Sequence, residues 1–240
     1  MCVIGKNLLV IGASSELERV IIKQLSDFGA ILTIADKEIT GMFIDNASFY
    51  TFDIFDNDCI EENIPKIIWD AGPFDGLLFC VTRSDFRPLI SVKHDVLEKI
   101  MNENYFSFID ILRTLVKKKG LNQGASIVAL SSISSIKGMK AKMAFCASKA
   151  ALDASVRCLA LELAPKSIRI NSIQKGIVKE DFSKDNIQSI TVINEGAELN
   201  KQPLGVTDGK EIANTIAFLM GDNAITITGT SIVIDGGFTI

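Results

Sequence analysis

The chain alternates between short, nearly continuous apolar runs and longer stretches in which apolar positions recur with a helical period. The runs are rich in Ile, Val and Leu, which is typical of parallel strands buried on both faces. They predict strands at residues 7–12, 30–36, 48–53, 76–81, 125–131, 168–173 and 231–235. The stretches between them predict helices near residues 16–28, 57–70, 92–118, 143–163 and 209–220.

This alternation predicts an α/β fold, a doubly wound parallel sheet of about seven strands with helices on both faces. A chain of 240 residues with 48% hydrophobic content can bury one large core, so we expect one domain over residues 1–240. Residues 180–206 have no clear period. They are either a lid over a pocket or a surface excursion, two readings that the sequence leaves open.

Charge and cysteine content exclude several classes of function. The formal net charge of -4 offers no basic stripe for a nucleic-acid backbone, so we expect no nucleic-acid partner. The cysteines (Cys2, Cys59, Cys80, Cys146 and Cys158) contain no C-x-x-C pair and are odd in number, which argues against a disulfide framework and against a metal site. These unpaired cysteines fit a reducing cytoplasm, where we expect the protein to lie. No segment approaches the roughly 20 apolar residues of a membrane span, so we expect a soluble protein.

The first predicted strand runs into the stretch "IGASSELERV", a strand-to-helix turn of the kind that binds a pyrophosphate. The stretch resembles the Gly-x-x-x-Gly-x-Gly turn of the short-chain dehydrogenase/reductase family, whose fold is Rossmann-like. Gly12 matches the first glycine, whereas Glu16 and Glu18 stand at the other two. The resemblance gives this turn the cofactor-binding candidates Gly12, Ser14, Ser15 and Leu17.

The two glutamates oppose binding of a phosphate at this turn. Glycines there allow close approach of the backbone, which a side chain prevents. A carboxylate about 5 Å from a phosphate charge costs on the order of 3 kcal/mol at an effective dielectric near 20, about two decades in affinity. Alternatively, Glu16 and Glu18 complement the helix dipole and cap free N–H groups. In either case the helix end has less to offer an external anion.

Two aspartates mark the adenosine side of the predicted crevice. Asp36 ends the second strand about two dozen residues after Gly12, where an acid binds a ribose and favours NAD over a 2′-phosphorylated cofactor. Asp53 matches the family's acid beside the adenine ring. Each aspartate is otherwise an ordinary residue at a strand end. Where the family carries Asn-Asn-Ala-Gly, residues 79–82 read "FCVT", which is also the pattern of a buried strand repacked without cofactor contacts.

The family's Asn-Ser-Tyr-Lys set falls on Asn104, Ser132, Phe145 and Lys149, with Ser132 thirteen residues before position 145 and Lys149 four after it. Positions four apart share one helix face, so Lys149 is expected beside residue 145. The resemblance implies catalytic roles for Ser132, Lys149 and Asn104. Phe145 carries no proton where the family's tyrosine acts as the acid. Taken alone, these residues also fit a polar loop and an ordinary amphipathic helix.

Changes continue in the last third of the chain. The stretch "IRINSIQKGIV" resembles the family's Ile-Arg-Val-Asn and Pro-Gly motif, with Lys175 in place of proline before Gly176, a further cofactor-binding candidate. Glu180 stands where the family often has a threonine contacting the nicotinamide carboxamide. The stretches "GKEIANTIAFLM" and "ITGTSIVIDGG" match the family's closing helix and last strand, so the resemblance covers nearly the whole chain.

Three hypotheses follow from these matches and departures. The first is a member with weak or no activity that acts as a binding or assembly module, with an active paralogue as a conceivable partner. The second is an NAD-dependent oxidoreductase of the 3-oxoacyl or polyol and sugar type, with a substitute acid. The third is a crevice for a less anionic ligand, such as a nucleoside. The resemblance also implies a homo-oligomer, a dimer or tetramer, packed through helices such as residues 143–163, whose alanines equally suit an internal core.

Overall fold

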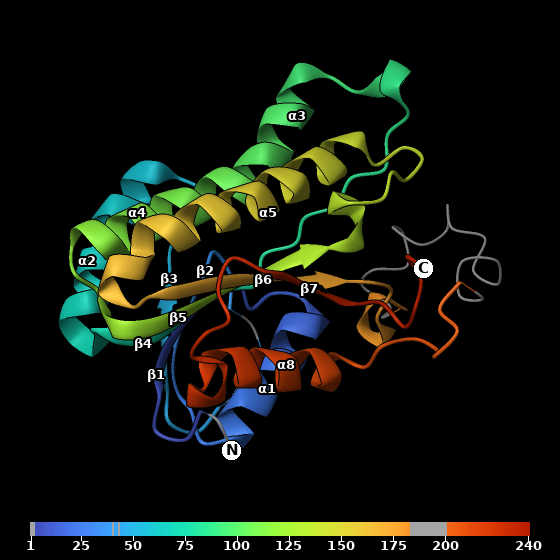
Figure 1. The fold of residues 1–240 in the computed structure, drawn as a ribbon. Helices are drawn as coiled ribbons and strands as arrows, with labels where there is room; N and C mark the ends of the chain where they lie inside the picture. Colours follow the sequence, from blue (N-terminus) through green and yellow to red (C-terminus); the bar gives the residue numbers. More distant parts are fainter. Residues whose placement is uncertain (1–2, 40, 43, 183–200) are drawn as a thin grey trace.

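Seven parallel strands form one sheet in the order β3-β2-β1-β4-β5-β6-β7 in the computed structural model, which describes residues 3–39, 41–42, 44–182 and 201–240 (Figure 1). The strands are β1 Asn7–Ile11, β2 Ile31–Asp36, β3 Ala47–Thr51, β4 Phe74–Phe79, β5 Leu121–Ser132, β6 Arg169–Lys175 and β7 Ser231–Ile234. The predicted α/β class, with its doubly wound sheet, is confirmed.

Helices cover both faces of the sheet (Figure 1). Helices α1 and α8 pack on one face, and α2, α4 and α5 pack on the other. Their bounds, with that of α3, are α1 Glu16–Asp27, α2 Asn57–Ala71, α3 His94–Met101, α4 Ser107–Lys117, α5 Met143–Leu163 and α8 Gly209–Met220. Among the residues that the structure describes, no helix is long and apolar enough to cross a bilayer.

The strand order reverses between β1 and β4, because β2 follows β1 on one side and β4 pairs with it on the other. Ile11 pairs with both Ala35 and Phe79, so the chain leaves all three strands at one edge. In open α/β sheets, the crevice at such a reversal is where ligands bind. The topology therefore places Gly12, Asp36 and the residues after Phe79 around one crevice.

The expected helix over residues 92–118 is interrupted. It begins at His94 and contains a π-helical turn, Asn102–Phe106, between α3 and α4. A π turn inserts an extra residue per turn and is frequent at functional sites. Here it contains Asn104, which is fully buried.

The strand expected over residues 76–81 ends earlier, at Phe79. The reason lies in the partners of the next residues. The carbonyl of Val81 accepts a hydrogen bond from Lys149, and the backbone of Arg83 is bonded by the side chain of Asn104. After Phe79, the side chains of Lys149 and Asn104 thus provide the backbone hydrogen bonds that a neighbouring strand would otherwise provide.

The irregular stretch expected over residues 180–206 lies mostly outside the described residues. Its first residues belong to a 3₁₀ turn, Lys179–Phe182, and at its other end Gln202 is buried. The lid hypothesis concerns residues 183–200, which are outside the described part of the chain.

Candidate active site

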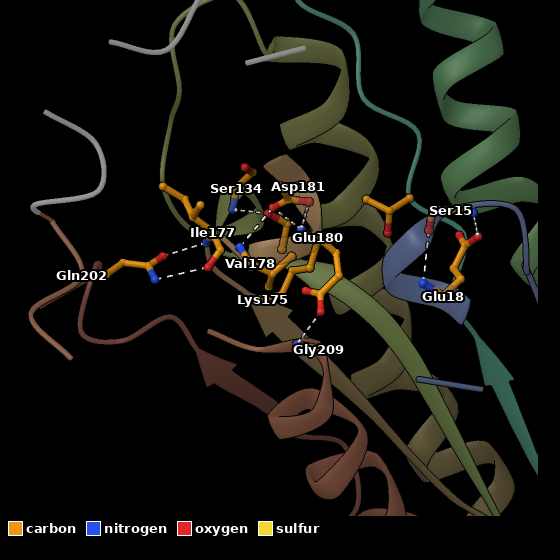
Figure 2. Close-up of polar contacts among 12 residues, drawn as sticks. Ser15, Glu18, Ser134, Lys175, Ile177, Val178, Glu180, Asp181, Gln202 and Gly209 are labelled. Carbon is orange, nitrogen blue, oxygen red and sulfur yellow. Dashed lines mark hydrogen bonds and ion pairs between the residues drawn. The ribbon is translucent and has the colours of Figure 1, made fainter. Parts of the chain in front are cut away.

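The turn after β1 is closed by its own side chains. Ser15 caps α1, because its Oγ accepts a hydrogen bond from Glu18 N at 3.2 Å while a carboxylate oxygen of Glu18 accepts one from Ser15 N at 2.7 Å. Figure 2 shows this reciprocal pair. Gly12 has φ +99°, and a Cβ there would lie 3.1 Å from Val81 N. The turn therefore needs glycine at position 12 and lies tightly against the end of β4.

The two glutamates of the turn differ in their surroundings. Glu16 is exposed, whereas Glu18 is 2% exposed. Burial raises the pKa of Glu18, the backbone hydrogen bond from Ser15 opposes that shift, and nearby Asp36 adds to it. Capping by Glu18, one of the two readings of the sequence, is thus confirmed. Leu17 is buried in the core between α1 and α8, so its side chain does not face the crevice.

Asp36 is also engaged inside the protein. One carboxylate oxygen accepts a hydrogen bond from Ala13 N at 2.7 Å and the other accepts one from Lys37 N at 2.6 Å. The side chain is 1% exposed. Asp53 forms an ion pair with Lys37 at 2.5 Å and accepts a hydrogen bond from Phe55 N at 3.0 Å. Both aspartates lie at the predicted edge of the sheet, and both accept hydrogen bonds from nearby backbone N–H groups.

Lys149 points into the protein. Its Nζ donates hydrogen bonds to the carbonyls of Val81 and Leu130, each at 2.9 Å, and lies 3.4 Å from Thr82 Oγ1. The side chain is fully buried, and burial lowers the pKa of Lys149 to about 7, partly offset by the nearby carboxylate of Asp153. The amine thus has three oxygen acceptors around it, two carbonyls and one hydroxyl.

Two other members of the catalytic set, Phe145 and Asn104, lie near Lys149. The Phe145 ring is buried, with its centroid 6.0 Å from Lys149 Nζ, as the helical spacing predicted. Ser132 Oγ, at the end of β5, accepts a hydrogen bond from Ser134 N at 3.1 Å. Asn104 Nδ2 donates to Ser148 Oγ at 3.1 Å, next to Lys149 in the chain. The structure therefore brings Phe145, Lys149 and Asn104 to one region.

The end of β6 carries a dense set of internal contacts (Figure 2). Lys175 forms an ion pair with Asp181 at 3.0 Å, and the same carboxylate accepts a hydrogen bond from Val178 N at 3.1 Å. Glu180 accepts one from Gly209 N, at the start of α8, at 3.1 Å. Glu180 and Lys175, the two substituted positions, thus bind other parts of the chain.

Gly176 lies between these contacts, where a Cβ would come within 2.7 Å of Asp235 Cα. This close packing leaves no room for a side chain at position 176, which explains the glycine. The side chain of Gln202 bonds both backbone groups of the following residue, Ile177. Its Oε1 accepts a hydrogen bond from Ile177 N at 2.7 Å, and its Nε2 donates one to Ile177 O at 3.2 Å. Sequence reasoning missed Asp181 and Gln202, since neither belongs to a motif.

Sequence reasoning also missed Arg83, which directly follows the altered "FCVT" run. Asn104 holds its backbone on both sides, accepting from Arg83 N at 2.8 Å and donating to Arg83 O at 2.7 Å. The Arg83 guanidinium donates to Ser14 Oγ at 3.0 Å, across the crevice between β1 and β4. From α1, Arg19 donates to the carbonyl of Ser14 at 3.0 Å. Ser14 is thus held by two arginines.

A pocket of about 520 Å³ opens on the β2 side of this bridge. Phe55, Val96 and Ile100 give it an apolar wall, and the remainder of the lining is polar or charged. That remainder consists of Ser14, Asp36, Lys37, Glu38, Arg83, Ser84, Asp85, Arg87, Lys99 and Glu103. The lining contains Ser14 and Asp36 but no member of the set Ser132, Phe145 and Lys149.

Comparisons with known proteins identify the family. A family model described as enoyl-(acyl carrier protein) reductase matches residues 23–239. D-erythrulose reductase of Gallus gallus is 27% identical over 98% of this chain and 96% of its own length. A 3-oxoacyl-[acyl-carrier-protein] reductase of Rickettsia felis is 29% identical over 97% of this chain and 96% of its own.

A solved structure has the same fold. The short-chain dehydrogenase of Leptospira borgpetersenii with bound NAD⁺ superimposes with a TM-score of 0.86 at 22% identity, over 100% of this chain and 94% of its own. The matches in sequence and in fold agree, and both span nearly the full length of each chain. This chain therefore belongs to the short-chain dehydrogenase/reductase family, whose members among its relatives are oxidoreductases.

Proposed function

We propose that this chain keeps the family fold but has weak or no oxidoreductase activity and acts as a binding or assembly module. The observation that carries the proposal is the pairing of Phe145 with an inward-bonded Lys149. Phe145 has no proton to give, and Lys149 Nζ points toward two backbone carbonyls. Loss of a positioned general acid typically removes about 10² to 10⁴ of the rate.

The residues of the crevice do not fit a dinucleotide. The backbone N–H groups of Ala13, Ser15 and Glu18, which would face a pyrophosphate, donate to Asp36, Glu18 and Ser15. A phosphate would have to displace these bonds, and would meet the Glu18 carboxylate at the same place. A helix N-terminus binds a phosphate through free N–H groups. In this turn three of those N–H groups already donate to acceptors within the protein.

The second candidate is a slow NAD-dependent oxidoreductase with a substitute acid. It is favoured by the pKa of about 7 for Lys149, at which protonated and neutral forms coexist near neutral pH. In that case Ser132 and Asn104 would complete the site, and Asp36 would favour NAD. Lys149 would have to release Val81 and Leu130 to reach a substrate.

Calorimetric titration with NADH and NADPH at low salt separates the two candidates. We expect no saturable heat at millimolar cofactor, because the turn's donors are already bonded. The Glu18→Gln variant is the control, since it removes the charge and keeps an oxygen acceptor for Ser15 N. Micromolar binding of NADH by the unaltered protein would overturn the proposal and lead to a carbonyl-substrate screen.

We also propose that residues 1–240 fold as one domain and assemble as a dimer or tetramer, with itself or with an active paralogue. The continuous sheet with a core on each face supports one domain. The outer face of α5 supports assembly, because Ala147, Ala154 and Leu161 are all exposed on it. A helix face that exposes apolar side chains beside charged Arg157 and Glu162 is suited to packing against another chain.

A further inference from the structure

Two segments meet at one end of the molecule, residues 84–91 after β4 and residues 136–143 leading into α5. The backbone N–H of Arg87 donates a hydrogen bond to Ala141 O at 2.8 Å, which joins them. In Figure 1 they are the teal-green and yellow-green loops at the upper right. We call the surface that these two segments form the loop surface.

The loop surface holds apolar side chains out into solvent. Leu89 and Ile90 begin the 3₁₀ turn Leu89–Ser91, and their exposed fractions are 76% and 94%. Ile136 and Met143, in the second segment, are exposed as well. Single apolar residues at a surface need no explanation, whereas a group of them marks a site of interaction. The loop surface is thus a candidate for contact with another body.

The second segment gives the loop surface a positive charge. Lys137 and Lys140 are exposed, and neither forms an ion pair with any residue that the structure describes. Residues 111–152 contain no aspartate or glutamate. In the first segment the one carboxylate, Asp85, pairs with Arg87 at 2.7 Å. The loop surface is therefore positive, although the chain as a whole has a net charge of -4.

Two kinds of partner fit positive charge beside exposed apolar side chains, an acidic protein and an anionic lipid surface. A protein partner ordinarily receives such side chains in well-packed pockets and offers side chains of its own in return. Leu89 and Ile90 stand at the tip of a turn, and neither lines the pocket of about 520 Å³. This shape favours lipid, because a protruding apolar tip enters the acyl boundary while neighbouring lysines stay at the headgroups.

We infer that the loop surface docks on an anionic membrane, with Leu89 and Ile90 inserted at the acyl boundary and Lys137 and Lys140 at the lipid phosphates. The contact is peripheral and reversible and needs no spanning helix. Each lysine near an anionic bilayer strengthens binding by about fivefold, and each apolar side chain that leaves water adds to it. The inference goes beyond the proposed function and holds whether or not a cofactor binds, because none of these four residues lines the pocket.

The test is co-sedimentation of the full chain at low salt with vesicles of equimolar phosphatidylcholine and phosphatidylglycerol, and with vesicles of phosphatidylcholine alone. We expect binding to the anionic vesicles that weakens as salt is added, and binding to the neutral vesicles that is about tenfold weaker or worse. Lys140→Glu should weaken binding to the anionic vesicles by about fivefold or more. Leu89→Ser combined with Ile90→Ser should weaken it by about tenfold or more.

Matched controls carry the same kinds of change elsewhere on the surface. Lys118→Glu reverses the charge of an exposed lysine at the end of α4, and Trp69→Ser removes an exposed apolar side chain from α2. Both variants should bind like the unaltered protein. Lys140 is the lysine to substitute, because Lys137 also donates a hydrogen bond to the Phe238 carbonyl at 3.0 Å.

Fluorescence distinguishes insertion into lipid from attraction between charges. Trp69→Phe removes the one tryptophan of the chain, so Ile90→Trp in that background reports on the tip alone. Its emission should shift to shorter wavelength on anionic vesicles and stay unchanged with polyglutamate. Three results would overturn the inference: no binding to anionic vesicles, undiminished binding by the Lys140 or the double serine variant, or an emission that does not shift. Binding to polyglutamate without binding to vesicles would overturn it too, and would assign the loop surface to an acidic protein.

Discussion

At the scale of single residues, Lys149 changes role with its surroundings. In the family pattern a lysine at this position lowers the pKa of a neighbouring tyrosine, and here its neighbour is Phe145. Its Nζ instead ties the end of β4 to β5, through Val81 and Leu130. A residue that matches a catalytic motif by spacing thus makes two internal backbone contacts here. Motif matching identifies the position, and the structure adds the contacts on which our proposal for its role rests.

The buried amine makes stability depend on pH. The pKa of Lys149 is about 7 in the folded protein and near 10.5 in the unfolded chain, so between these values the unfolded chain binds more protons. Stability should therefore rise with pH across this window, with this lysine contributing on the order of 2 kcal/mol between pH 6 and pH 9. We expect Lys149→Met to flatten that rise.

Urea unfolding of Lys149→Met at pH 6 and at pH 9 checks this expectation. The substitution orphans two carbonyls at every pH, so the informative quantity is the difference between the two pH values. Lys140→Met, at an exposed lysine of the preceding loop, should keep the slope of the unaltered protein. An unchanged slope in Lys149→Met would show that the amine is not the titrating group.

At the scale of elements, the capping box of Ser15 and Glu18 stabilises the N-terminus of α1. Ser15→Ala removes the acceptor for Glu18 N, and we expect the free energy of unfolding to fall by about 0.5–2 kcal/mol. Ser15→Thr keeps a hydroxyl acceptor and should lose much less. Denaturant titration of the two variants measures the difference. Equal stability of Ser15→Ala and the unaltered protein would mean that the cap contributes nothing.

The elements themselves were predictable from local pattern, and their junctions were not. Hydrophobic runs located all seven strands, and spacing located Lys149 beside Phe145. The end of β4 depends on Lys149, which is 68 positions away from Val81 in the chain. The guanidinium of Arg83 meets Ser14 from 69 positions away. A periodic pattern contains no information on such distant partners, so the closed turn and the Arg83 bridge required the fold.

At the scale of the whole molecule, the outer face of α5 is the surface through which we propose that the chain assembles. Leu161 is 79% exposed there, and Cys158 and Phe106 lie exposed on the same side of the sheet. Burying such a face against a second copy removes apolar surface from water. Leu161→Glu would place a charge in the proposed interface, so we expect the proposed oligomer to dissociate.

Light scattering at micromolar concentration measures this change. The unaltered protein should have a mass that is a multiple of 26.1 kDa, and Leu161→Glu should move toward the single-chain mass. Trp69→Glu, at a 90% exposed position on α2, is the control and should leave the mass unchanged. A mass of 26.1 kDa for the unaltered protein would contradict the proposed assembly.

The bond between Ala13 N–H and Asp36 also bears on how the turn moves. An amide hydrogen exchanges with solvent only when its bond opens, so the Ala13 amide should exchange slowly even when no small molecule is bound. A turn that is ordered in this way has little entropy left to lose when a small molecule binds beside it. Binding beside it would therefore leave the motion of the first turn nearly unchanged, and the two events would be thermodynamically separate.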